Sequence, residues 1–178
     1  EDVSDKAALD EAIVSFKTWF DNHSTATPKD IVDMLKRTQT LASLRTSDRY
    51  CIFLGGAFTE AAATKNEIKK YQGVFTALLT NEIQQRQLIA AIEWLCGAKY
   101  PQLLKFFPVF LKQIFDEDLI EEDLFFQWDS DMTPNDYSVD RSFVSVAVLE
   151  QLKQSAKPFL VWLDEAEEED DESEDEDA

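Results

Sequence analysis

The sequence is poor in the residues from which catalytic and metal sites are usually built. Its 178 residues include one histidine, His23, and two cysteines, Cys51 and Cys96. A Ser-His-Asp or Cys-His pair would have to use His23, whose polar neighbours are instead typical of an exposed helix end. One histidine and two distant cysteines also argue against a structural zinc site. Both cysteines lie among apolar residues, which indicates buried free thiols in a reducing compartment.

Glycine and long apolar runs are equally scarce. Of the four glycines, Gly55 and Gly56 are adjacent but lack the following Lys-Ser or Lys-Thr of a phosphate loop, so close helix packing explains them better. No run approaches the roughly 20 apolar residues that span a bilayer, and no signal peptide precedes the first expected helix. A cytoplasmic location is expected, with no membrane partner and no cofactor. The start at Glu1 without Met suggests a piece of a longer protein.

Basic residues are outnumbered by acids, 17 to 36, and the formal net charge is -19. Residues 164–178 alone hold twelve acids and no base. A chain of this charge is repelled by phosphate backbones, which argues against direct nucleic-acid binding. The acids lack the D-x-D-x-D-G spacing of a calcium loop, and solvated acids do not supply the dry cleft of a catalytic pair. Basic proteins are the expected partners.

Apolar residues recur at helical spacing through most of the chain. Leu9, Ile13, Phe16 and Phe20 form one such stripe, and similar stripes follow at residues 31–35, 50–58, 68–79 and 88–95. The pattern predicts an all-α protein of about seven or eight helices, arranged as a HEAT-like stack of antiparallel helical hairpins. Within it, Thr27 is expected to cap a helix that begins at Pro28.

Proline and loop signals divide the second half of the chain. A kink or break is expected at Pro108, and Pro158 is expected to bend or divide the last helix. Residues 129–142 give the strongest loop signal. Beyond Glu165 the sequence lacks apolar anchors, so we expect a domain at residues 1–166 and a disordered acidic tail at 167–178.

Two segments combine dense acids with large aromatic rings. The first, FDEDLIEEDLFFQWDSD at residues 115–131, places Ile120, Leu124 and Trp128 on one helical face, which predicts that this face is core and that the acids surround it. The second, KPFLVWLDEAEEEDDE, pairs Trp162 with the acidic extension. One such segment is usually only solvated surface. Two of them in the last third of the chain favour an adaptor that captures a lysine-rich partner.

These two segments resemble the aromatic and acidic boxes that close the C-terminal HEAT domain, or two-tryptophan domain, shared by several translation initiation proteins. That family includes initiation factor five, the epsilon subunit of the exchange factor for initiation factor two, the factor-five mimic proteins and initiation factor four G. The resemblance covers about residues 5–170, and its boxes lie at about 114–131 and 156–170. The Ala-Lys-Pro-Phe sequence at 156–159 looks most like factor five.

The resemblance implies which residues bind partners. By position, the box residues are Phe115, Asp116, Glu117, Asp118, Glu121, Glu122, Asp123, Trp128, Phe159, Trp162, Asp164, Glu165, Glu167, Glu168 and Glu169. In this family, such boxes bind lysine-rich segments of the initiation factor two beta subunit and the initiation factor three c subunit. A monomeric binding module without its own catalysis is therefore expected.

Two alternatives stay open at this point. A domain like that of the epsilon subunit would act on a GTPase and accelerate GDP release, whereas an inhibitor would slow this release. The resemblance also implies a basic patch for contacts with initiation factors one and four G. Its candidates are Lys65, Lys69, Lys70, Arg86, Lys99 and Lys105.

Overall fold

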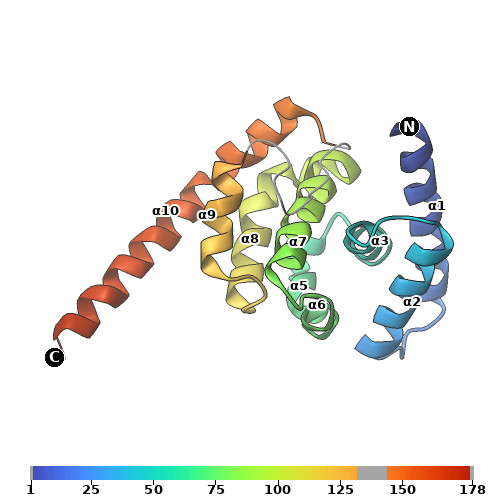
Figure 1. Ribbon diagram of the computed structural model, residues 1–178, viewed down its shortest axis with the longest axis horizontal. Helices are drawn as coiled ribbons and strands as arrows, with labels where there is room; N and C mark the ends of the chain where they lie inside the picture. The colour runs from blue at the N-terminus through green and yellow to red at the C-terminus, as the bar shows by residue number, and fades with distance from the viewer. Residues whose placement is uncertain (1, 132–143, 177–178) are drawn as a thin grey trace.

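The all-α prediction is confirmed in the computed structural model, which describes residues 2–131 and 144–176 (Figure 1). In these two ranges the chain forms ten α-helices and no strand. The helices are α1 (Asp2–Asp21), α2 (Pro28–Leu41), α3 (Asp48–Ala57), α4 (Ala62–Lys65), α5 (Glu67–Lys70), α6 (Gln72–Leu78), α7 (Glu82–Trp94), α8 (Phe107–Asp116), α9 (Glu122–Ser130) and α10 (Val146–Glu176). The single-turn helices α4 and α5 raise the number above the seven or eight expected. Most of the loop predicted at 129–142 lies outside the described residues.

The helices pack as a stack that runs along the longest axis of the molecule. Helix α3 packs against α1, α2 and α7, while α7 also contacts α8 and α9, and α8 contacts α10. Figure 1 shows α1 and α2 at one end and α9 and α10 at the other. The two aromatic and acidic boxes therefore lie together at the C-terminal end of the stack. None of the described helices combines the length and hydropathy required to cross a membrane.

Local sequence signals explain the N-terminal half of the stack. Leu9, Ile13 and Phe16 of α1 are buried as the stripe predicted. Thr27 caps α2 as expected: its side chain accepts from the backbone N–H of Asp30, whose carboxylate accepts from the backbone N–H of Thr27. A Cβ atom at Gly56 would lie 2.6 Å from the Phe16 ring, which confirms that close packing of α3 on α1 requires this glycine.

Helix breaks follow proline less regularly than expected. The predicted break at Pro108 is confirmed, because a 3₁₀ segment at Pro101–Phe106 ends there and α8 begins with Pro108 in its first turn. Helix α10, in contrast, continues through Pro158, so it is not divided there, and the alternative expectation of a bend stays a prediction. Pro158 and Gln154 are both exposed, so the Gln154 carbonyl, which loses its helical donor, can bond to water.

Helix α10 is 31 residues long, and only its first part packs against the stack. Its buried residues recur at helical spacing and end with Leu163. The disordered tail was expected to begin at residue 167, but the structure continues α10 as helix to Glu176, beyond the other elements (Figure 1). The division of the chain at Ala166 stays a prediction.

A buried polar cluster joins α7, α9 and α10 behind the first box. Trp128 of α9 is 1% exposed, and its indole N–H donates to the carboxylate of Glu93 on α7, which is fully buried. Lys153 of α10 is also buried, and its Nζ lies 4.9 Å from the centre of the Trp128 ring. The prediction that Trp128 belongs to the core is confirmed.

Lys153 also closes the C-terminal end of α9. Its ammonium donates to the carbonyl oxygens of Trp128, Asp129 and Asp131 at 2.5, 2.9 and 2.6 Å. These carbonyls lie where a helix has no internal donors left and carries partial negative charge, so a cation there is favourable. Arg86 of α7 adds an ion pair with Asp131 at 2.5 Å. The end of α9 is therefore fixed by charged groups from two neighbouring helices.

We expect Trp128→Ala to lower the free energy of unfolding by about 3–5 kcal/mol, because it empties a large buried site and leaves Glu93 without the indole donor. Trp162→Ala is the matched control, since Trp162 is 41% exposed and should cost clearly less. Chemical denaturation of both variants measures the difference. Equal losses would contradict the assignment of Trp128 to the core.

We expect Lys153→Met to lower the free energy of unfolding by about 1–3 kcal/mol, because three carbonyls lose their donor while the apolar stem is retained. Lys157→Met is the control: it removes the same charge from an exposed position one turn further along α10. Its effect should stay within about 0.5 kcal/mol. A similar loss from both lysines, measured by denaturant titration, would show that the buried ammonium is not required.

Candidate functional site

The first box is built around the turn that joins α8 to α9. Leu119 N–H donates to the Ile114 carbonyl and Asp118 N–H to the Phe115 carbonyl, the hydrogen bonds of a Schellman helix end. Asp118 has a φ of 53°, in the left-handed region that usually favours glycine. An aspartate tolerates this conformation better than most residues. The turn thereby exposes Asp116 and Asp118 beside the start of α9.

The start of α9 explains part of the acid content of this box. Glu122 and Asp123 lie in its first turn, where the partial positive charge of a helix N-terminus favours carboxylates. The backbone N–H of Glu121 donates to the Gln85 side chain of α7 at 2.9 Å, which fixes the turn to the stack. The positive charge of the helix N-terminus favours Asp123, whereas for Glu122 it is opposed by partial burial and by neighbouring acids.

The predicted binding residues of the second box lie on the part of α10 that follows Pro158. Phe159 is buried and Trp162 is 41% exposed. Asp164, Glu165, Glu168 and Glu169 are exposed, while Glu167 is partly buried. Asp164 and Glu168, like Glu165 and Glu169, are like charges four residues apart on α10, a spacing that disfavours the helix. Charge pairing within the helix therefore offers no explanation for them.

Aromatic contacts bring the two boxes together. Phe115 lies edge-on to Trp162, with ring centroids 5.7 Å apart, and 6.5 Å from Phe159. Phe125 of α9 makes a further edge contact with Phe159 at 5.3 Å. Such edge-to-face pairs are favourable in addition to the apolar area that they bury. These contacts fix the position of the second box relative to the first.

The acids of the two boxes also meet. The pKa of Glu122 is raised above its ordinary value by partial burial and then by the negative charges of Glu167, Asp123 and Asp170. Two of these three charges belong to α10, so the carboxylates of the two boxes face a common space. In the described chain, a single acid among residues 116–123 and 164–169 forms an ion pair, namely Asp116 with Lys112 at 2.5 Å.

The predicted box residues fall into two groups by exposure. Trp128 and Phe159 are buried, so they position the boxes and do not offer contact surface. The others are exposed or partly exposed. They are Phe115, Asp116, Glu117, Asp118, Glu121, Glu122, Asp123, Trp162, Asp164, Glu165, Glu167, Glu168 and Glu169.

Sequence reasoning missed the lysines of this region and misplaced one arginine. Lys112 precedes Asp116 by four residues on α8, a spacing that the sequence does reveal. Lys153 gives no local signal, because its partners lie more than 20 residues away. Arg86 was named as a candidate for a basic surface patch, but its side chain is 2% exposed and pairs with Asp131, so it cannot belong to such a patch.

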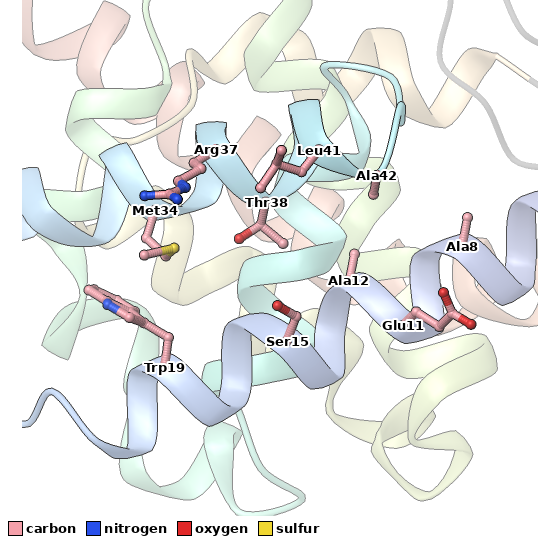
Figure 2. A pocket seen from close by; sticks show the side chains of 10 residues that line it. All are labelled: Ala8, Glu11, Ala12, Ser15, Trp19, Met34, Arg37, Thr38, Leu41 and Ala42. Carbon is pink, nitrogen blue, oxygen red and sulfur yellow. The ribbon is translucent and has the colours of Figure 1, made fainter.

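The groove between α1 and α2 lies at the opposite end of the stack. Figure 2 shows its walls, where Trp19 and Met34 lie near one another and Glu11 and Arg37 supply the charges. His23 follows α1 and stacks on Trp19, and its Nδ1 lies 2.6 Å from the Trp19 carbonyl oxygen. The prediction that His23 marks a helix end is confirmed. Across the described residues, no group of three or more His, Cys, Asp and Glu side chains could hold a metal ion.

Comparison with known proteins identifies a family whose sequence pattern this chain matches. The family described as W2: eIF4-gamma/eIF5/eIF2-epsilon matches residues 84–173, which include both boxes. The chain is 28% identical over 149 residues to eukaryotic translation initiation factor 5 of Saccharomyces cerevisiae, covering 84% of this chain and 34% of that protein. It is 32% identical over 105 residues to the Mus musculus factor, covering 58% of this chain and 23% of that protein.

A solved structure supports the same relationship. "The C-terminal Domain of Translation Initiation Factor 5 at low pH" aligns with a TM-score of 0.65 and 25% identity, covering 92% of this chain and 96% of that one. The HEAT-like stack predicted from the sequence is thereby confirmed. The chain spans about a third or less of the curated relatives, so it corresponds to one part of such proteins. Because the family match covers more than half of its residues, the chain belongs to the W2 family of eIF4-gamma, eIF5 and eIF2-epsilon.

Proposed function

We propose that the two boxes form one docking surface for lysine-rich segments of other initiation factors. The partners are the lysine-rich tail of the initiation factor two beta subunit and the initiation factor three c subunit. By holding both, the domain helps to assemble the preinitiation complex in the cytoplasm. It acts as a binding module and not as an enzyme.

The convergence of the two boxes is the observation that carries this proposal. Segments 45 or more residues apart meet through the contact of Phe115 with Trp162 and through the carboxylates around Glu122. Together they present many acids and a single internal ion pair in the described chain. A surface of this kind is complementary to a chain with many lysines.

The acids of α10 support the same conclusion because they oppose the helix in which they lie. Like charges four residues apart, such as Asp164 with Glu168 and Glu165 with Glu169, disfavour the helical state. A cationic partner would relieve this repulsion. One exposed ion pair contributes only about 0–1 kcal/mol, so useful affinity requires many pairs acting together.

Nucleotide exchange is the second candidate, because the matched family also includes eIF2-epsilon. An exchange domain would accelerate GDP release from its GTPase when present in substoichiometric amounts, whereas a docking module would leave the rate unchanged. Acceleration by the isolated chain would contradict the binding-only proposal.

We expect the chain to bind a hexalysine peptide in calorimetric titrations, and we expect binding to weaken as salt rises because screening shortens the reach of each charge to about 8 Å at physiological ionic strength. The test variant replaces Glu121, Glu122, Asp123, Glu167, Glu168 and Glu169 with the corresponding amides. Its affinity should fall by at least about tenfold, which corresponds to only about 1.4 kcal/mol over six charges.

The control variant neutralises six exposed acids outside the boxes: Asp5, Asp10, Glu11, Glu60, Glu82 and Glu150. It changes net charge by the same amount, so it measures the general effect of charge on binding. Circular dichroism checks that both variants remain folded. Equal weakening by the two variants would mean that the chain binds lysine as a general polyanion, and the proposal would fail.

We expect Glu122→Gln to raise the melting temperature of the free domain at pH 7. The folded-state pKa of Glu122 is raised, so its ionised form carries a penalty that is present above this pKa and disappears as the pH falls through it. The gain should therefore shrink toward about pH 4, close to the ordinary glutamate pKa. Glu60→Gln, at an exposed position outside the boxes, is the control. A gain that is independent of pH would contradict the raised pKa of Glu122.

A further inference from the structure

Trp162 is a large aromatic side chain held rigidly at the surface. Its ring stacks on Phe159, with centroids 6.1 Å apart and planes inclined by 28°, and meets Phe115 edge-on. Although these contacts fix its orientation, 41% of the residue remains exposed. A fixed and partly exposed indole presents a face that can attract a cation.

In the free domain the cation over the Trp162 ring is the ammonium group of the chain's own Lys112. Its Nζ lies 4.7 Å from the centre of the Trp162 ring and 2.5 Å from an oxygen of Asp116. An aromatic face and a carboxylate together supply the two kinds of contact that favour a lysine ammonium group. The Lys112 and Asp116 side chains are 42% and 49% exposed, so solvent and other molecules can reach this pair.

The buried lysine of the first box provides a comparison within the same molecule. Lys153 lies over Trp128 at 4.9 Å, but it is buried and donates to three carbonyl oxygens. Removing that ammonium would leave those carbonyls without their donor. Among the described residues, Lys112 has only the surface contacts with Trp162 and Asp116, and its flexible side chain can turn into water when they are lost.

We propose that the Trp162 ring and the Asp116 carboxylate form a binding site for a lysine of the partner, which Lys112 occupies until the partner displaces it. This inference rests on the proposed docking function and specifies where one partner lysine binds. Trp162, Glu165 and Glu169 share one face of α10 by their spacing, so the site continues into the acids of the second box. Lys112 is thus an internal competitor that lowers the affinity for lysine-rich segments.

The test compares hexalysine binding to Lys112→Met and Lys105→Met by calorimetry at one salt concentration. Lys105 is also an exposed lysine over an aromatic ring, with its Nζ 5.2 Å from the centre of Phe106, but it has no ion pair in the described chain. Both variants remove one positive charge, so general attraction changes equally. Lys112→Met should bind about two- to fivefold tighter than Lys105→Met, as expected when a cation no longer has to be displaced from an exposed ring. Lys112→Gln should give the same gain.

A double-mutant cycle with Trp162→Leu tests whether the gain in hexalysine affinity depends on the Trp162 ring. In that background, Lys112→Met should bring a clearly smaller improvement, because the site then lacks its aromatic face. Suppose that parent binding depends on the box acids but Lys112→Met binds no tighter than Lys105→Met. The inference that Lys112 competes with the partner is then wrong, and the docking proposal stands. If neutralising the box acids leaves parent binding unchanged relative to its control, the docking proposal itself fails.

Discussion

The end of the molecule that carries the two boxes depends on one buried cation. Lys153 brings its ammonium from α10 to the last carbonyls of α9 and over the ring of Trp128. The desolvation of this charge is offset by three hydrogen bonds to carbonyl oxygens and by the contact with the Trp128 ring. Because the contact crosses between helices, it fixes the position of α9 relative to α10. The two boxes can then meet.

The same region separates residues that maintain the fold from residues that remain available for contact. Trp128 and Phe159 are buried, whereas Trp162 is partly exposed and the acids that follow it lie past the last core residue, Leu163. The aromatic residues thus provide a rigid base, and the acids receive little support from the helix that carries them. Selection for stability alone would not produce this distribution of charge.

Much of this arrangement could be predicted from the sequence where the signal is local. Helical stripes indicated the class, Thr27 and Pro108 marked helix starts, and the spacing of Ile120, Leu124 and Trp128 identified the buried face of α9. Signals that depend on distant partners failed, because periodicity does not reveal which residues meet across helices. Arg86 was therefore assigned to the surface, and the role of Lys153 was not recognised. The uninterrupted helix at Pro158 depends on exposure, which spacing alone does not give.

The length of α10 has a consequence for the kinetics of encounter. From Leu163 to Glu176 the helix extends about 20 Å beyond its last buried residue, at about 1.5 Å per residue. This distance exceeds twice the screening length of about 8 Å at physiological ionic strength. The far end of the helix therefore attracts cations from a volume that the body of the domain does not reach. In the proposed docking function, a lysine-rich chain bound there has only to search along α10 toward Trp162.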